Sequence, residues 1–132
     1  MNNAYVRELL ADHSSNPRNY GTLPDPDIVE RVDNPQCVGP THPEGDWISV
    51  SLTVSDEEPR VIESVRFEGA GCTLSQAATS LLTQQMEGTE LKKIRSWDRE
   101  FIEQQVGMDL TPARLQCAEL VVRAVRQGEF NE

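Results

Sequence analysis

Three cysteines, Cys37, Cys72 and Cys117, are the only thiols of this 132-residue chain and carry its most informative chemistry. They lie far apart, with 34 residues between the first two and 44 between the last two. An odd number of cysteines cannot all pair into intramolecular disulfides, and no C-x-x-C pair is present. Three thiolates gathered by a fold would supply most of a tetrahedral site for a soft metal. The alternative is three unrelated thiols, because free cysteine is often a core residue.

Cys72 and Cys117 have different local settings. Cys72 ends a glycine-rich run, residues 69–72, and opens a helical pattern. A helix N-terminus favours an anion, so the pattern predicts a lowered pKa for the Cys72 thiol and a reactive thiolate. Cys117 shares a helical stripe with Leu120 and Val121, which is typical of a core cysteine. Both interpretations of Cys117, core residue and ligand, stay open on these grounds.

Two further side chains near Cys37 are candidate ligands. Asp46 begins a predicted strand, where an acidic residue is also common as part of a turn. His42 lies on a loop rich in proline and glycine, residues 39–45, between Cys37 and Asp46. A loop histidine is usually solvated, but this one is close enough in sequence to reach a site that contains Cys37.

Length and charge limit the class of protein. A chain of 132 residues is expected to form one domain, residues 1–132. The 22 acidic and 12 basic residues give a net charge of −10, which disfavours binding to nucleic acid and to anionic membranes. The sequence shows no signal peptide and no apolar run long enough for a membrane span. We therefore expect a cytoplasmic protein, in which thiols stay reduced.

The first half of the chain predicts one helix and a small sheet. A helix is expected over about residues 3–13, with one stripe formed by Tyr5, Val6, Leu9, Leu10 and His13. A short strand is expected over residues 28–32. Alternating apolar and polar residues predict a strand over residues 47–54, a turn over 55–59 and a returning strand with Val61, Val65 and Phe67 inward.

The second half is predicted to be helical. Helical spacing of apolar residues runs from Leu74 to Met86 and stops at Gly88. Two short helices follow near residues 90–95 and 98–106, and Thr111 caps a last helix. Its stripe holds Ala113, Cys117, Leu120, Val121 and Ala124. Strands followed by helices predict an α+β fold, a small three-stranded antiparallel sheet with helices packed on one face.

Several segments, taken in order, resemble the U-type iron–sulfur cluster assembly scaffolds, the group of IscU, SufU and the NifU N-terminal domain. The matching segments occur in order along nearly the whole chain: residues 12–13, 16–21, 34–37, 67–80, Gly88 and 113–120. The resemblance implies a SufE/NifU-like fold and a site that assembles iron and sulfide, most often as a [2Fe–2S] cluster, or that holds zinc. Thiolates are the usual ligands of such clusters.

Residue by residue, the resemblance implies that Cys37, Cys72 and Cys117 are the ligands. Asp46 would be the fourth, because residues 45–46 match the Gly-Asp of the family's Cys-Gly-Asp motif. Cys117 and Cys72 are the candidate acceptors of persulfide sulfur. The implied partners are a cysteine desulfurase and the apo forms of iron–sulfur acceptor proteins. A carboxylate binds a soft cluster less well than a thiolate, which would help the cluster to leave.

The chain departs from the family pattern at several positions. Eight residues, 38–45, separate Cys37 from Asp46 where the family usually has one glycine, so His42 or Glu44 are substitute ligands if Asp46 is displaced. Gln116 precedes the last cysteine, where the IscU branch has histidine; this is closer to SufU. The short spacing between the second and third cysteines is closer to IscU. Residues 110–114 differ from the segment that the dedicated IscU chaperone reads, so that partner is not expected.

Three functions follow from these features. The first is a scaffold, not itself an enzyme, that receives sulfur from the desulfurase, builds a labile cluster and passes it on. The second is a SufU-like sulfurtransferase in which zinc occupies the site. The third is a degenerate family member that binds partners but no metal. Metal analysis after anaerobic purification distinguishes the three.

Overall fold

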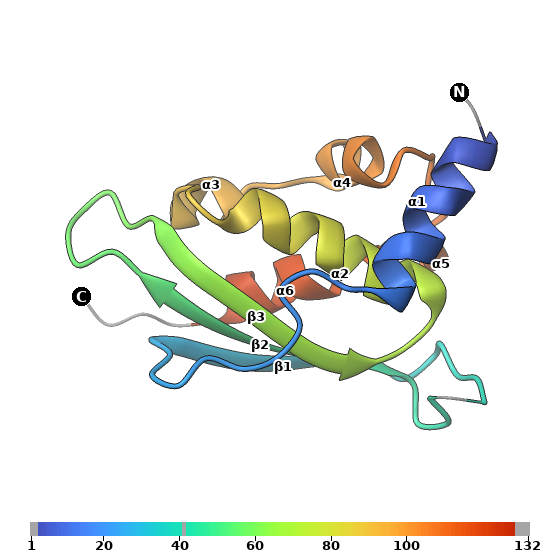
Figure 1. Cartoon of the computed structure of the whole chain (residues 1–132), viewed down its shortest axis with the longest axis horizontal. Coiled ribbons are helices and arrows are strands. Elements are labelled where there is room, and N and C mark those ends of the chain that lie inside the picture. Colours follow the sequence, from blue (N-terminus) through green and yellow to red (C-terminus); the bar gives the residue numbers. More distant parts are fainter. Residues whose placement is uncertain (1–2, 41, 129–132) are drawn as a thin grey trace.

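A computed structural model describes residues 3–40 and 42–128 of the chain. Within them, three strands and six helices form two layers, with the helices on one face of the sheet (Figure 1). The elements in chain order are α1 (Asn3–Ser15), β1 (Ile28–Asn34), β2 (Asp46–Val54), β3 (Ile62–Ala70), α2 (Thr73–Met86), α3 (Leu91–Arg95), α4 (Arg99–Val106), α5 (Pro112–Ala118) and α6 (Leu120–Gln127). The predicted α+β class and the three-stranded antiparallel sheet are confirmed.

The sheet is antiparallel with strand order β1-β2-β3, so β2 is central. The predicted alternation of β2 is confirmed, because its apolar residues at even positions, Ile48 to Val54, are all buried. On β3 the prediction was wrong at one position: Ile62 faces the core, and Val61 precedes the strand. The cause is an irregularity in register beside Val54, which pairs Val54 with Ile62 and shifts the inward side by one residue.

The helices bury their apolar sides against this sheet and against one another. Phe67, Leu82 and Met86 are among the fully buried residues at the centre of the core. The first helix runs two residues beyond its predicted end, and its Tyr5 is 63% exposed, so Tyr5 does not belong to the buried stripe. The predicted stripe of the last helix is wrong at Ala113, which is exposed.

The last helical segment is two helices, because the chain bends at Glu119. The bend gives the two halves different neighbours. Helix α5 packs on α2, whereas α6 covers β1 and β2. The predicted cap of this segment is confirmed, since the Thr111 hydroxyl accepts a hydrogen bond from the amide of Arg114. Asp98 caps the start of α4 in the same way, since its carboxylate accepts the amide of Phe101.

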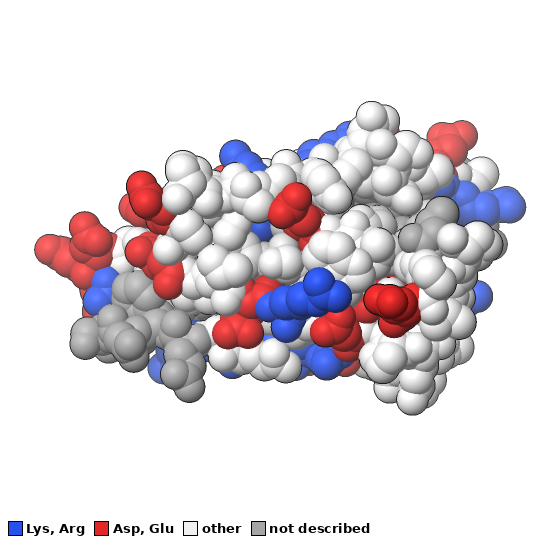
Figure 2. All heavy atoms as spheres, turned by 90° about the horizontal axis from the view of Figure 1, so that it is seen from below, with Lys and Arg blue, Asp and Glu red and all other residues white. Residues whose placement is uncertain are grey.

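The face of the sheet that the helices leave uncovered carries charged residues of both signs, mixed together (Figure 2). On this face Arg31 lies over the ring of Trp47, 4.2 Å from its centroid, and pairs with Asp33. The mixture offers no broad basic surface for nucleic acid. Among the described helices, none is long and apolar enough to cross a membrane.

Candidate metal centre

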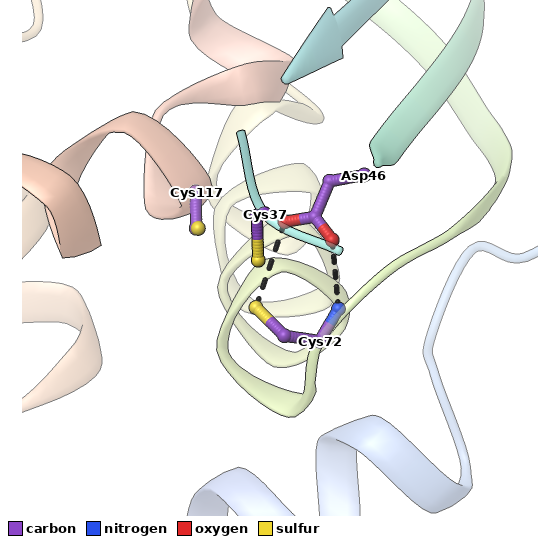
Figure 3. Close-up of side chains that lie close together, drawn as sticks. All are labelled: Cys37, Asp46, Cys72 and Cys117. Carbon is purple, nitrogen blue, oxygen red and sulfur yellow. Dashed lines mark hydrogen bonds between the residues drawn. The ribbon is translucent and has the colours of Figure 1, made fainter. Parts of the chain in front are cut away.

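The three cysteines and Asp46 converge at one end of the sheet (Figure 3). One ligand atom from each of Cys37, Asp46, Cys72 and Cys117 lies within 4.8 Å of all the others. These residues come from four separate parts of the chain, so only the fold brings them together. The convergence expected from the sequence is therefore what the structure has, and the roles of the four as ligands are taken up below.

Each side chain is positioned by the end of a regular element. Asp46 is the first residue of β2 and pairs in register with Asn34, the last residue of β1. The backbone of Cys37 folds back in a turn, and its amide donates to the carbonyl of Asn34 at 3.2 Å. Cys72 follows β3 and is the N-cap of α2, while Cys117 lies in α5. The end of the sheet and two helices therefore surround a single point.

The eight-residue segment 38–45 does not displace Asp46. The segment closes on itself through reciprocal backbone hydrogen bonds between Gly39 and His42, at 3.3 and 3.1 Å. Gly45, at φ +103°, then returns the chain to β2 so closely that a Cβ there would overlap the backbone of Asn34. The described residues of the insert thus leave the chain after Cys37 and rejoin it at Asp46, beside the site. The exposed side chain of Glu44 is not part of the cluster.

The carboxylate of Asp46 is fully buried, and its two oxygens have different contacts. Oδ1 accepts the backbone amide of Cys72 at 2.9 Å. Oδ2 lies 3.5 Å from the sulfur of the same residue (Figure 3). Gly71 permits this approach, because a Cβ at that position would overlap the Ser75 hydroxyl and lie 2.6 Å from Oδ1.

The pKa of the Cys72 thiol is lowered to about 6, the direction expected from the sequence, but the main cause is different. The largest contribution is a hydrogen bond from the Cys117 thiol to the Cys72 sulfur. Burial opposes it, and the amide of Ser75, which donates to the Cys72 sulfur at 3.4 Å, favours the thiolate again. The helix start contributes through that one amide, whereas the neighbouring thiol contributes more.

The other two thiols behave in the opposite way. Burial raises the pKa of Cys37 to about 11. The pKa of Cys117 is raised as well, first because its thiol donates to Cys72 and then because of burial. At neutral pH Cys72 is therefore the thiolate of the three cysteines, whereas Cys37 and Cys117 stay thiols. The Cys72 sulfur lies 3.5 Å from Oδ2 of the buried Asp46, so a sulfur donor and an oxygen donor face the same point.

The donor set matches a soft or borderline metal. Cysteine sulfurs bind both zinc and iron–sulfur clusters, and a carboxylate oxygen is a further ligand of zinc. In a zinc tetrahedron with bonds near 2.3 Å, neighbouring sulfurs are about 3.8 Å apart. The donor atoms here lie within 4.8 Å of each other, so closing on one ion needs a movement of about an ångström or less.

The site opens into a hollow of about 550 Å³. Cys37, Cys72 and Cys117 line it, and exposed Arg114 and Gln116 from α5 stand on its wall. The three thiols are thus reached through this hollow, whereas the buried Asp46 does not line it.

Comparison with known proteins identifies the family. The NifU-like N terminal domain model matches residues 5–131. The chain belongs to this family. Family membership and the cysteine–aspartate cluster agree, because three of the matching segments, residues 34–37, 67–80 and 113–120, supply the three cysteines that meet at the site.

Relatives with assigned functions belong to two branches of the family. The chain is 30% identical to the zinc-dependent sulfurtransferase SufU of Bacillus subtilis, over 96% of this chain and 90% of that protein. It is 29% identical to the iron–sulfur cluster assembly scaffold protein IscU of Escherichia coli, over 90% and 87%.

Solved structures show the same fold. The 2.3 Å crystal structure of a hypothetical protein has a TM-score of 0.72 at 25% identity, covering 96% of this chain and 97% of that one. The N-terminal part of a NifU-like protein from Brucella abortus has a TM-score of 0.65 at 18% identity, covering 90% and 88%. The second comparison concerns the fold alone.

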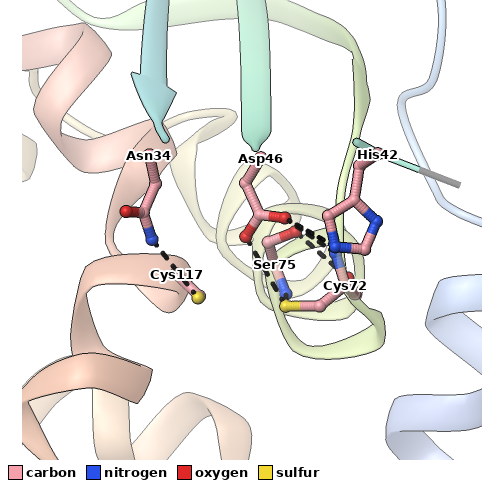
Figure 4. A network of polar contacts seen from close by, with 6 residues as sticks. All are labelled: Asn34, His42, Asp46, Cys72, Ser75 and Cys117. Carbon is pink, nitrogen blue, oxygen red and sulfur yellow. Dashed lines mark hydrogen bonds and ion pairs between the residues drawn. The ribbon is translucent and has the colours of Figure 1, made fainter. Parts of the chain in front are cut away.

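Two groups at the site were not assigned roles from the sequence. The buried Asn34 donates its side-chain amide to the Cys117 sulfur at 3.5 Å (Figure 4). Ser75 donates its backbone amide to Cys72. Asn34 belongs to the motif that ends in Cys37, but the sequence holds no signal that pairs it with a residue 83 positions away.

Proposed function

We propose that the protein is an iron–sulfur cluster assembly scaffold that accepts sulfur, builds a labile cluster on Cys37, Asp46, Cys72 and Cys117, and transfers it to acceptor proteins. The observation that carries the proposal is the convergence of these four donors around a hollow open to solvent. Membership of a family that includes IscU and SufU proteins supports it. The buried carboxylate is the weakest of the four ligands toward a soft cluster, which favours release.

The sulfur donor in this proposal is a cysteine desulfurase. A thiolate of this chain attacks the outer sulfur of the donor's persulfide, a new sulfur–sulfur bond forms, and the donor's thiolate leaves. Cys72 and Cys117 are the candidate acceptors. Cys72 holds the thiolate at neutral pH, and Cys117 is the thiol that contacts it. The expected cytoplasmic location stays a prediction, in keeping with chemistry that needs reduced thiols.

A second candidate function is a zinc-dependent sulfurtransferase, in which zinc holds the site until sulfur is delivered. The relationship to the Bacillus subtilis SufU favours it, since the match covers nearly the full length of both chains. The compact donor set also suits a single tetrahedral ion. The dedicated chaperone of IscU systems is not part of either proposal, because residues 110–114 lack its recognition pattern.

Anaerobic purification followed by metal and sulfide analysis tests both functions. Reconstitution would use ferrous iron, cysteine and a cysteine desulfurase. Iron together with acid-labile sulfide identifies the scaffold. One tightly held zinc per chain, with persulfide on a cysteine and no cluster, identifies the sulfurtransferase. A protein that takes up neither metal after reconstitution overturns both and leaves the degenerate partner-binding module.

Matched aspartate variants show whether Asp46 belongs to the site. Asp46→Ala is expected to lose metal or shorten the lifetime of the cluster while the metal-free chain still folds. Asp33→Ala is the control, because Asp33 also lies near the end of a strand but is exposed and pairs with Arg31. Equal metal retention in the two variants would remove Asp46 from the proposed ligand set.

A further inference from the structure

The side chain of His42 lies against Asp46, on the side away from Cys117 (Figure 4). Its Nε2 is 3.6 Å from Oδ1 of Asp46, and the two side chains are 8% and 0% exposed. His42 comes from the eight-residue insert 38–45, the segment by which this chain departs from the family pattern. A buried imidazole therefore contacts a buried carboxylate at the edge of the candidate centre.

His42 lies outside the cluster of four donors. Its ring nitrogens are not part of the group of donors that lie within 4.8 Å of one another. The imidazole approaches Oδ1, the oxygen that already accepts the Cys72 amide, whereas Oδ2 faces the Cys72 sulfur. The two oxygens of Asp46 therefore point to different surroundings. Oδ1 faces the amide and the imidazole, and Oδ2 faces the thiols.

The insert is built to hold the ring in this place. Reciprocal backbone hydrogen bonds join Gly39 and His42, and the imidazole lies directly over Gly39. A Cβ at Gly39 would lie 2.8 Å from Cε1 and 3.0 Å from Nε2 of the ring. Pro40 and Pro43 lie within the segment and restrict its backbone. The ring is thus clamped between Gly39 and Asp46.

We propose that His42 is a positioning residue, which holds Oδ1 of Asp46 and so directs Oδ2 toward the three sulfurs as a single-oxygen ligand. Partners of this kind orient first ligands in metal sites, and their loss typically weakens metal binding by about 10–100-fold. A movement of a few tenths of an ångström brings the 3.6 Å contact into hydrogen-bonding range. The inference rests on the proposed function, because it gives the carboxylate its binding mode at that same site.

Zinc affinity, measured by competition with a chromophoric chelator, tests the role. We expect His42→Ala to weaken zinc binding by about 10–100-fold and His42→Gln, which keeps a donor, to recover most of that loss. Gly39→Ala should give a smaller loss, because the added methyl displaces the ring. Glu44→Gln is the control from the same insert, because the side chain of Glu44 is exposed. The zinc affinity of this variant should stay within about twofold of that of the unaltered protein.

A double-mutant cycle separates positioning from direct ligation. If His42 acts through Asp46, adding His42→Ala to Asp46→Ala changes zinc affinity by less than about twofold, since contacting residues couple strongly. A further loss close to that of His42→Ala alone overturns the proposal. So does a His42→Ala variant that binds zinc as tightly as the unaltered protein.

Cobalt substitution supplies a readout that a merely structural role would not move. The visible bands of bound Co²⁺ report the ligands and their geometry, so His42→Ala should shift them while Glu44→Gln leaves them unchanged. Unfolding of the metal-free variants must remain cooperative and near that of the unaltered chain; if His42→Ala unfolds, the comparison passes to His42→Gln and Gly39→Ala. Failure of the unaltered protein to bind Zn²⁺, Co²⁺ or iron would instead refute the proposed function. Metal binding that is indifferent to His42 refutes the positioning role alone.

Discussion

In the metal-free protein, Cys72 should be the first thiol to react with a disulfide reagent at neutral pH. Its pKa is about 6, against about 11 for Cys37. At pH 7 about nine-tenths of Cys72 is thiolate, compared with about one part in ten thousand of Cys37. The more basic thiolate is intrinsically the better nucleophile; with a Brønsted coefficient of about 0.4–0.5, this returns a factor of about 100–300 to Cys37. Cys72 should therefore react about 30–90 times faster.

The assay uses chelator-treated protein without oxygen and a limiting amount of a pyridyl disulfide, with acid quenching and peptide mapping by mass spectrometry. The initial rate at Cys72 should reach half its maximum near pH 6 and level off above pH 7, because a lowered pKa keeps the thiolate until the pH falls to that value. An ordinary thiol would keep rising to about pH 9. Earlier modification of Cys37 or Cys117, or a midpoint near 9, would refute the reasoning.

The source of the lowered pKa can be tested separately. Cys117→Ala removes the hydrogen bond that contributes most to the Cys72 thiolate, so the midpoint should move to higher pH. Cys37→Ala removes a weaker hydrogen bond and should move it less. If Cys117→Ala leaves the midpoint near 6, the start of α2 and not the Cys117 thiol is the main cause. If Cys37→Ala moves the midpoint further than Cys117→Ala does, the main donor is Cys37 and the assignment to Cys117 is wrong.

Two further predictions concern the frame around the site. Gly69→Ala should destabilise the fold by about 1–3 kcal/mol in urea unfolding, because a Cβ there overlaps the backbone carbonyl oxygen of Trp47 on the neighbouring strand; an unchanged midpoint would contradict this. Ser80→Ala should cost about 1–3 kcal/mol by leaving the buried His13 ring and the amide of Arg18, which contact its hydroxyl at 2.7 and 2.8 Å, without that partner. Zinc affinity should not change in this variant, and a parallel loss of zinc would tie Ser80 to the site.

Local patterns predicted the regular elements well. The buried residues of β2 and of the helix from Leu74 to Met86 follow the alternating and helical spacing of apolar residues in the sequence. That spacing was therefore enough to predict which side of each element faces the core. The errors lie where packing against another element, and not the local pattern, determines which side chain is buried. Ile62 faces inward because of the register beside Val54, and Ala113 is exposed because the last helical segment bends and turns α5 away from α6.

The candidate site was only partly predictable for the same reason. The cysteines and Asp46 could be chosen by residue type and family resemblance, but their distances depend on the fold. The hydrogen bond between Asn34 and Cys117 joins the end of β1 to α5, and no local pattern encodes it. The main cause of the lowered pKa of Cys72 is likewise a thiol from the far end of the chain, whereas the helix start visible in the sequence supplies a smaller part.

The position of Asp46 explains how an eight-residue insert can be accepted beside a metal site. The ladder between β1 and β2 already fixes Asp46 opposite Asn34, and the amide of Cys72 fixes Oδ1, so the carboxylate does not depend on the length of the loop before it. The length and sequence of the loop are then free to vary, and in this chain the loop places His42 beside Oδ1 of Asp46. In the proposed centre, such a loop would change how firmly the oxygen ligand is held. Because a soft metal or cluster would hold that ligand least strongly, its orientation is where retention and release of the proposed cargo would be adjusted without moving the three thiols.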